Sequence, residues 1–202
     1  LLEEALDAGA MGIGTSRTLF HRASDGSPIP TLDATNEELL ALARTLRKAG
    51  KGVFQIVEDV HLPGKDVSVL RQLAEASGRP LTFSMGTGNS GPQIWPQLLQ
   101  GLEEANAAGV TIKGQVMPRA IGMMLGVELT LNPFYTTAGY REVAGLPLPE
   151  RLAKLRDPAR RARILGEPTD PDPTLVLGRM VRDFDYMFLL GDPPDYEQPW
   201  EQ

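Results

Sequence analysis

Hydrophobic and polar positions over the first 120 residues alternate between two kinds of segment. Helix-like stretches with one apolar stripe end at a glycine, and a short apolar run begins within three residues of it. A glycine just past a helix adopts the left-handed conformation that closes the last turn. Each repeat predicts a helix followed by a buried strand, at Gly9 with AMGIG, Gly50 with GVFQI, Gly78 with PLTFS and Gly109 with VTIKG.

The stretch between the first two predicted strands is the clearest helix. Thr35 and Glu38 form a T-x-x-E capping box, and apolar residues follow at i, i+3, i+4 and i+7 spacing. Further helices are predicted at 66–77, beginning at Asp66, and at 92–108, beginning near Pro92. After a proline-rich stretch we expect two short helices, at 148–156 and 158–166, separated by the Asp157-Pro158 break.

This repeated order of helix, glycine and strand predicts an α/β protein with consecutive parallel strands. Residues 1–125 form its βα units, whereas prolines interrupt the pattern afterwards. We expect residues 126–190 to be an irregular or helical insertion with later sheet elements, and residues 191–202 to be an extended or disordered tail. The chain opens with LLEEALDAG, already inside an amphipathic helix, so we expect it to be part of a longer protein.

Composition narrows the functional classes. With 26 acidic and 20 basic residues, the net charge of −6 argues against a nucleic-acid partner. The dense basic run at 151–163 lies on helical sequence and is typical of a solvated face. The absence of cysteine excludes disulfides, zinc-thiolate sites and cysteine nucleophiles. No run approaches the roughly 18 apolar residues of a membrane span, and we expect a cytoplasmic protein with no membrane partner.

Polar side chains follow the predicted strands, where parallel sheets place their chemistry. Glu58 and Asp59, with His61 just beyond, suit metal ligation or general-base work, or a purely structural role. Because adjacent strand residues face opposite sides, we expect at most one of the two carboxylates at the mouth of the sheet. Arg119 suits either a substrate carboxylate or an ordinary salt bridge. The other strand-end candidates are Thr15, Ser16, Arg17, Ser84, Thr87, Asn89 and Gln115.

Two further features carry weaker signals. The glycine-rich loop MGTGNSG at 85–91 could cradle an anion on its backbone amides or serve as a flexible turn, and it lacks the lysine of a phosphate loop. His21 lies in the loop after the first strand. With two histidines in the chain there is no H-x-H or H-E-x-x-H motif, so a purely local metal site is not expected.

The order of segments resembles the amidohydrolase family, specifically its N-acyl-D-amino-acid deacylase (D-aminoacylase) branch. The segments are GAMGIGTSRT, a T-x-x-E helix, GKGVFQ, RPLTFS, a tryptophan-containing helix and GQVMPR followed by GVELTLNPF, with VLGRMVRDFDYMF further on. The resemblance implies a (β/α)8 TIM barrel, of which this chain would supply roughly half the strands. It also implies a hydrolase that cleaves the linear amide of an N-acyl-D-amino acid with water activated by zinc or another divalent metal.

The same comparison implies departures from the family. Its H-x-H strand and late catalytic aspartate would lie outside this chain, and Val57 and Met85 stand where histidines would fall. Neither is a zinc ligand, so we expect no metal bound to this fragment and negligible hydrolysis by it alone. The implied substrate-binding residues are Arg119, Gln115 and Arg17, with Glu58, Asp59 and Ser84 as weaker candidates.

Two functions stay open at this stage. One is a fragment of a hydrolase that binds a small N-acyl amino acid. The other is a non-catalytic scaffold, derived from the barrel, that has lost its metal ligands and binds a small acid or a partner chain. Because half a barrel leaves strand edges unpaired, a homodimer through those edges is a further expectation.

Overall fold

The computed structural model describes residues 1–23, 27–60, 67–86, 95–119, 122–129, 131–168, 181–182, 184–193 and 195–197. The chain divides into two compact units, Leu1–Ala120 and Ile121–Gln202. The domain boundary that the sequence places at residue 125 stays a prediction. In the described part of the chain, no helix is both long and apolar enough to cross a membrane.

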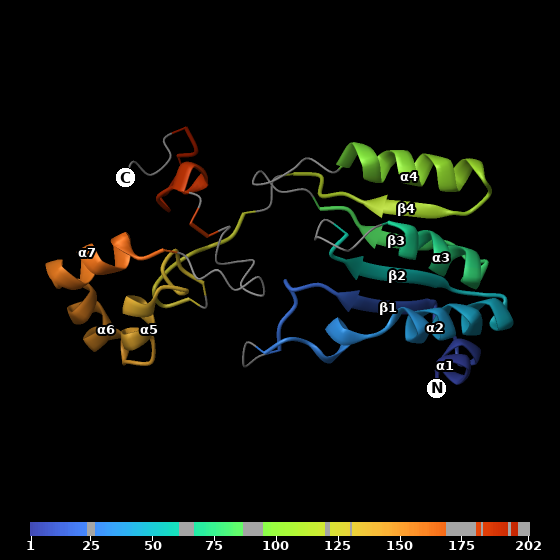
Figure 1. Ribbon diagram of the computed structural model, residues 1–202, viewed down its shortest axis with the longest axis horizontal. Coiled ribbons are helices and arrows are strands. Elements are labelled where there is room, and N and C mark those ends of the chain that lie inside the picture. The colour runs from blue at the N-terminus through green and yellow to red at the C-terminus, as the bar shows by residue number, and fades with distance from the viewer. Residues whose placement is uncertain are drawn as a thin grey trace. The chain divides into compact units, whose positions relative to one another are not determined.

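The first unit is an α/β fold in which a four-stranded parallel sheet alternates with helices. The strands pair in chain order, β1-β2-β3-β4, and their arrowheads point the same way in Figure 1. All four predicted strands are therefore confirmed. The elements are α1 (Leu2–Asp7), β1 (Gly12–Arg17), the 3-10 helix η1 (Pro30–Asp33), α2 (Asn36–Ala49), β2 (Val53–Glu58), α3 (Ser68–Ser77), β3 (Leu81–Ser84), α4 (Trp95–Ala107) and β4 (Ile112–Gln115).

Local sequence signals explain where these elements begin and end. The predicted glycines have positive φ angles of 106° at Gly9, 66° at Gly50, 56° at Gly78 and 81° at Gly109. At the start of α2, the Thr35 side chain accepts a hydrogen bond from the Glu38 N–H at 3.2 Å, which is one of the two hydrogen bonds of the predicted capping box. The predicted starts of the next two helices, at residues 66 and 92, lie outside the described residues.

The core of this unit lies on one face of the sheet. Alternate residues of the strands pack there against apolar stripes on the helices, and the sheet contributes four fully buried side chains from its two central strands. These are Phe54, Ile56, Leu81 and Phe83. They meet Leu39, Ala43 and Leu46 of α2, and Leu70, Leu73 and Ala74 of α3. The helices thus cover one face of the sheet, which we call the covered face.

The second unit is a helical region. It contains α5 (Ala138–Ala144), α6 (Leu148–Leu155), α7 (Pro158–Gly166) and the short 3-10 helix η2 (Phe184–Tyr186). The two helices predicted around Asp157 are confirmed, and its side chain caps α7 by accepting from the Ala159 N–H at 3.1 Å. The sequence reading missed α5. The described residues of this unit contain no strand, and a small core forms from Tyr140, Val143 and Ile164.

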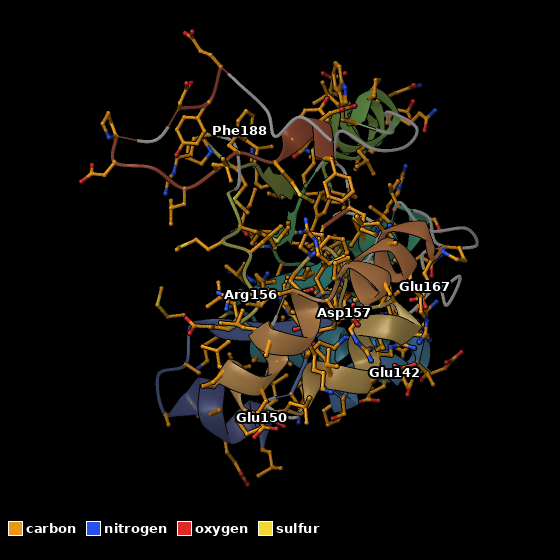
Figure 2. The ribbon with its side chains drawn as sticks, turned by 90° about the vertical axis from the view of Figure 1, so that its left-hand side faces the viewer. Glu142, Glu150, Arg156, Asp157, Glu167 and Phe188 are labelled. Atoms are coloured by element: carbon orange, nitrogen blue, oxygen red, sulfur yellow. The ribbon has the colours of Figure 1, made fainter. Side chains whose placement is uncertain are left out.

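Arginines of the basic run at 151–163 hold this unit together. Arg151 donates to the carbonyls of Val127 and Leu146. Arg160 and Arg163 both pair with Glu142, at 2.9 and 2.8 Å. Figure 2 labels Glu142 in this helical region. Hydrogen bonds from the two arginines, that from Arg160 first, hold the pKa of Glu142 below its usual value of 4.5.

Candidate functional site

The face of the sheet opposite the helices carries polar and small side chains. Strand pairing aligns alternate residues across the sheet, with Gln55 beside Gly14 and Ser84 beside Gln115. These positions are half-buried or exposed, unlike the neighbours that point into the core. We call this the open face. Its members are Gly14 and Ser16 of β1, Gln55 and Val57 of β2, Thr82 and Ser84 of β3, and Lys113 and Gln115 of β4.

Two of the predicted substrate-binding residues lie together at the carboxyl end of this face. Ser84 and Gln115 are the last residues of adjacent strands and are direct neighbours in register. The Gln115 carbonyl also accepts the Met85 N–H at 2.9 Å. Arg119 follows shortly after β4, is exposed, and makes no hydrogen bond to another described residue. Ser84 and Gln115 can therefore present neutral donors and acceptors to a bound molecule, and Arg119 follows four residues later in the chain.

Arg17 and Glu58 lie on the covered face instead. They end adjacent strands, and Arg17 Nε donates to Glu58 Oε2 at 2.6 Å. The two side chains are 6% and 0% exposed. Arg17 Nη1 also donates to the Ala34 carbonyl at 3.0 Å and to Asn36 Oδ1 at 2.8 Å. This ion pair fastens the ends of β1 and β2 to the start of α2, which is a structural role.

Asp59 is buried as well, and it anchors the loop that follows β1. Its Oδ1 accepts from Thr18 Oγ1 at 2.6 Å, and its Oδ2 accepts from the Leu19 N–H at 2.8 Å. Thr18 Oγ1 in turn accepts from the Phe20 N–H at 3.2 Å. Both carboxylates, Glu58 and Asp59, are therefore buried and hydrogen-bonded within the protein. Their neighbour His61 lies outside the described residues.

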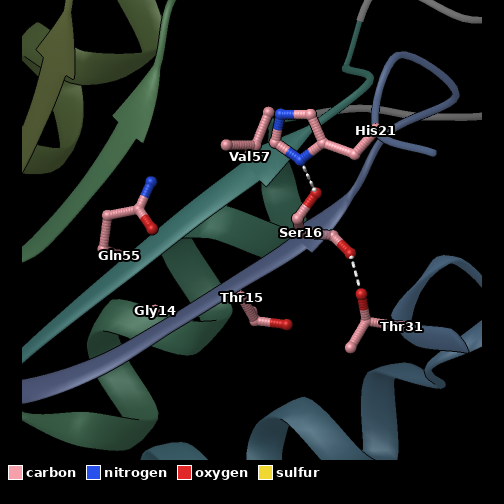
Figure 3. Close-up of a pocket in the computed structure, with 7 residues that line it drawn as sticks. All are labelled: Gly14, Thr15, Ser16, His21, Thr31, Gln55 and Val57. Carbon is pink, nitrogen blue, oxygen red and sulfur yellow. Dashed lines mark hydrogen bonds between the residues drawn. The ribbon is translucent and has the colours of Figure 1, made fainter. Parts of the chain in front are cut away.

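A pocket of about 350 Å³ opens between the carboxyl ends of β1 and β2. Figure 3 shows its lining residues, which are Gly14, Thr15, Ser16, His21, Thr31, Gln55 and Val57. The Ser16 hydroxyl and His21 Nδ1 are 2.7 Å apart, and the Thr31 hydroxyl donates to the Ser16 carbonyl at 2.7 Å. Sequence reasoning named Ser16 and His21 separately but did not pair them. The pairing depends on the path of the loop between them.

Among the described residues, no group of three or more His, Cys, Asp or Glu side chains is placed to hold a metal ion. Val57 lies on the open face and lines the pocket. Met85, just past β3, packs against the core on the covered face. Its sulfur lies so close to Gly114 that a Cβ atom there would be only 3.0 Å away. The two positions compared with metal-binding histidines therefore face opposite sides of the sheet.

Most of the glycine-rich loop at 85–91 lies outside the described residues, as do Thr87 and Asn89.

Comparison with known proteins assigns no class to this fold and site. No protein-family description, curated protein or solved structure matches the chain.

Proposed function

We propose that this chain forms about half of a (β/α)8 barrel and supplies the substrate-holding part of an amidohydrolase-like enzyme. The observation that carries the proposal is the strand order β1-β2-β3-β4 with the helical core on one face. A doubly wound sheet reverses its strand order and carries helices on both faces. In a barrel the order is consecutive, the helices lie outside and the other face turns inward. The open face would then turn toward the inside of the barrel, with Ser84 and Gln115 at the mouth formed by the carboxyl ends of the strands.

The substrate class that fits best is an N-acyl-D-amino acid, the class that the resemblance implies. Such a molecule has one amide group and one carboxylate. Ser84 and Gln115 offer hydrogen bonds to the amide from adjacent strand ends, and the exposed Arg119 guanidinium offers a bidentate partner to the carboxylate. Arg17, Glu58 and Asp59 take no part in this arrangement, because their polar groups bind other parts of the protein.

The role assigned to this chain is to bind and orient the substrate. In the enzymes that it resembles, a divalent metal supplies the activated water. No reaction step is assigned to a metal on this chain. We therefore expect the 202-residue chain to hold the substrate weakly and to hydrolyse it negligibly by itself.

The test is hydrolysis of N-acetyl-D-amino acids by the complete protein that its gene encodes. We expect turnover of the D series over the L series, and an Arg119→Ala variant with KM raised about tenfold, the loss of about 1.4 kcal/mol expected for a charge-assisted hydrogen bond. Arg71→Ala is the matched control, because Arg71 pairs with Glu75 on the surface of α3. An unchanged KM in Arg119→Ala would contradict the assignment.

The second candidate function is a non-catalytic scaffold that binds a small acid. It is favoured by Val57, which puts an apolar side chain in the pocket at the open face. This candidate predicts that the complete protein binds N-acyl amino acids in an Arg119-dependent way and hydrolyses none of them. Observed turnover that survives rigorous purification would exclude it.

A further inference from the structure

The Ser16 and His21 pair is the one place in the described structure where a hydroxyl and an imidazole meet, and both residues line the same shallow, open pocket. The oxygen and Nδ1 are 2.7 Å apart, within the range of a nucleophile and its general base. Ser16 is half-buried at the end of β1 and His21 is exposed. Figure 3 shows the imidazole above the Ser16 side chain and beside Val57.

The fold holds both partners in place. Ser16 pairs with Val57 in the strand register, and its carbonyl accepts the Thr31 hydroxyl. The loop that carries His21 is tied down at Thr18 and Leu19 by the buried Asp59. Further along, Arg22 forms an isolated bridge with Pro28, which closes the loop after His21. The start of the loop that carries His21 is thus anchored by the buried Asp59, and the Ser16–His21 contact itself is exposed.

The chemistry of the lining indicates a neutral ligand. None of the seven lining residues is an acid, lysine or arginine, and the polar groups are hydroxyls, one amide and one imidazole. Val57 and Gly14 supply apolar surface for a short chain of carbon atoms. Gln55 supplies an amide N–H that can donate to a carbonyl oxygen. A volume of about 350 Å³ lies at the small end of the range for ligand sites.

We propose that Ser16 is a nucleophile activated by His21 and that the pocket accepts small carboxylic esters. This activity is separate from the amide hydrolysis proposed above and uses no metal. In the tautomer with its proton on Nε2, the His21 Nδ1 accepts the Ser16 hydroxyl proton. His21 is therefore the general base, and the Gln55 amide N–H donates to the developing oxyanion.

The reaction runs in two balanced steps. Ser16 Oγ forms a bond to the carbonyl carbon, its proton moves to His21, and the ester C–O bond breaks as the alcohol leaves with that proton. Water then attacks the acyl-serine, loses a proton to His21, and the acyl–Oγ bond breaks. The proton returns to Ser16 and the carboxylic acid leaves. The net change is hydrolysis of one ester by one water.

The test treats the purified 202-residue chain with a fluorophosphonate, which traps an activated serine. The Ser16 oxygen forms a bond to phosphorus, the phosphorus–fluorine bond breaks, and fluoride and the proton leave. We expect one adduct, mapped to Ser16 by peptide mass, and none in Ser16→Ala. His21→Gln keeps an oxygen acceptor for Ser16 but has no basic nitrogen, so the labelling rate should fall about 100-fold.

One control variant and two further readouts keep the test decisive. Thr45→Ala removes an exposed hydroxyl that binds the Ala41 carbonyl on α2, and it should label at the wild-type rate. Thermal unfolding of each variant shows whether the fold is retained, since Ser16 and His21 lie outside the core cluster. Turnover of p-nitrophenyl acetate should be lost with Ser16→Ala. Absence of an adduct on Ser16, or equal labelling of wild type and a folded His21→Gln, would overturn the proposal.

Discussion

The two faces of the sheet use the same four strands for different purposes. On the covered face, Phe54 and Phe83 are fully buried against helices. On the open face, one residue along each strand, Gln55 and Ser84 are half-buried and polar. The comparison shows that a polar residue at a strand end is not in itself a sign of chemistry. Glu58 ends β2 but faces the helices, where it stabilises the fold.

The largest effect should come from neighbouring substitutions on opposite faces. Phe83→Ala removes a fully buried ring and should lower the free energy of unfolding by about 3–5 kcal/mol. Thr82→Val should be neutral or slightly stabilising, because the Thr82 hydroxyl is buried without a hydrogen-bond partner among the described residues. Urea denaturation measures both. Equal losses at the two positions would break the distinction between the faces.

A somewhat smaller effect should come from the buried ion pair. Glu58→Gln leaves the Arg17 guanidinium without its carboxylate and should lower the free energy of unfolding by about 3 kcal/mol. The double variant Arg17→Met with Glu58→Leu should recover part of that loss, because no uncompensated charge remains buried. A double variant with a lower free energy of unfolding than Glu58→Gln would contradict this, because it would show that the two side chains do not stabilise the fold as a pair.

The smallest effect should come from Glu142, whose ion pairs with Arg160 and Arg163 are on the surface. Its pKa is lower in the folded chain than its usual value of 4.5, chiefly through the hydrogen bond from Arg160. The ionised carboxylate therefore stabilises the fold at pH values above 4.5. This contribution is lost as the pH falls through the lowered pKa of the folded chain.

Wild type and Glu142→Gln should accordingly differ slightly near neutral pH and converge in acid. Urea denaturation at a series of pH values measures the difference, and the exposed site makes it far smaller than that at Glu58. A gap that widens in acid would contradict the sign of the pKa change.

The strands and most helices could be predicted because their signals are local. The glycines at residues 9, 50, 78 and 109 have positive φ angles and end helices through their local backbone conformation, without help from distant residues. The helix α5 was missed because it is short and lies between prolines, with the Thr137 side chain as its main cap. The four-strand order confirms the α/β class, whereas closure into a barrel stays a prediction.

The site was harder to predict because it depends on contacts between distant residues. Strand alternation allowed one of Glu58 and Asp59 to reach the mouth, yet Asp59 is buried beyond the end of β2 and is hydrogen-bonded to Thr18. That contact holds the start of the loop after β1, and in the same loop His21 meets Ser16. No local pattern around either residue encodes the pairing. The neighbouring placement of Ser84 and Gln115 follows from register, which the sequence leaves open.

The most direct test of the open face as the binding face is an amide NMR titration of the 202-residue chain. N-acetyl-D-leucine would be compared with its L enantiomer at millimolar concentrations. The account predicts saturable shifts at Ser84, Gln115 and Arg119, stronger for the D form and lost in Arg119→Ala. Shifts confined to the helices α5 to α7, or none at any concentration reached, would contradict it.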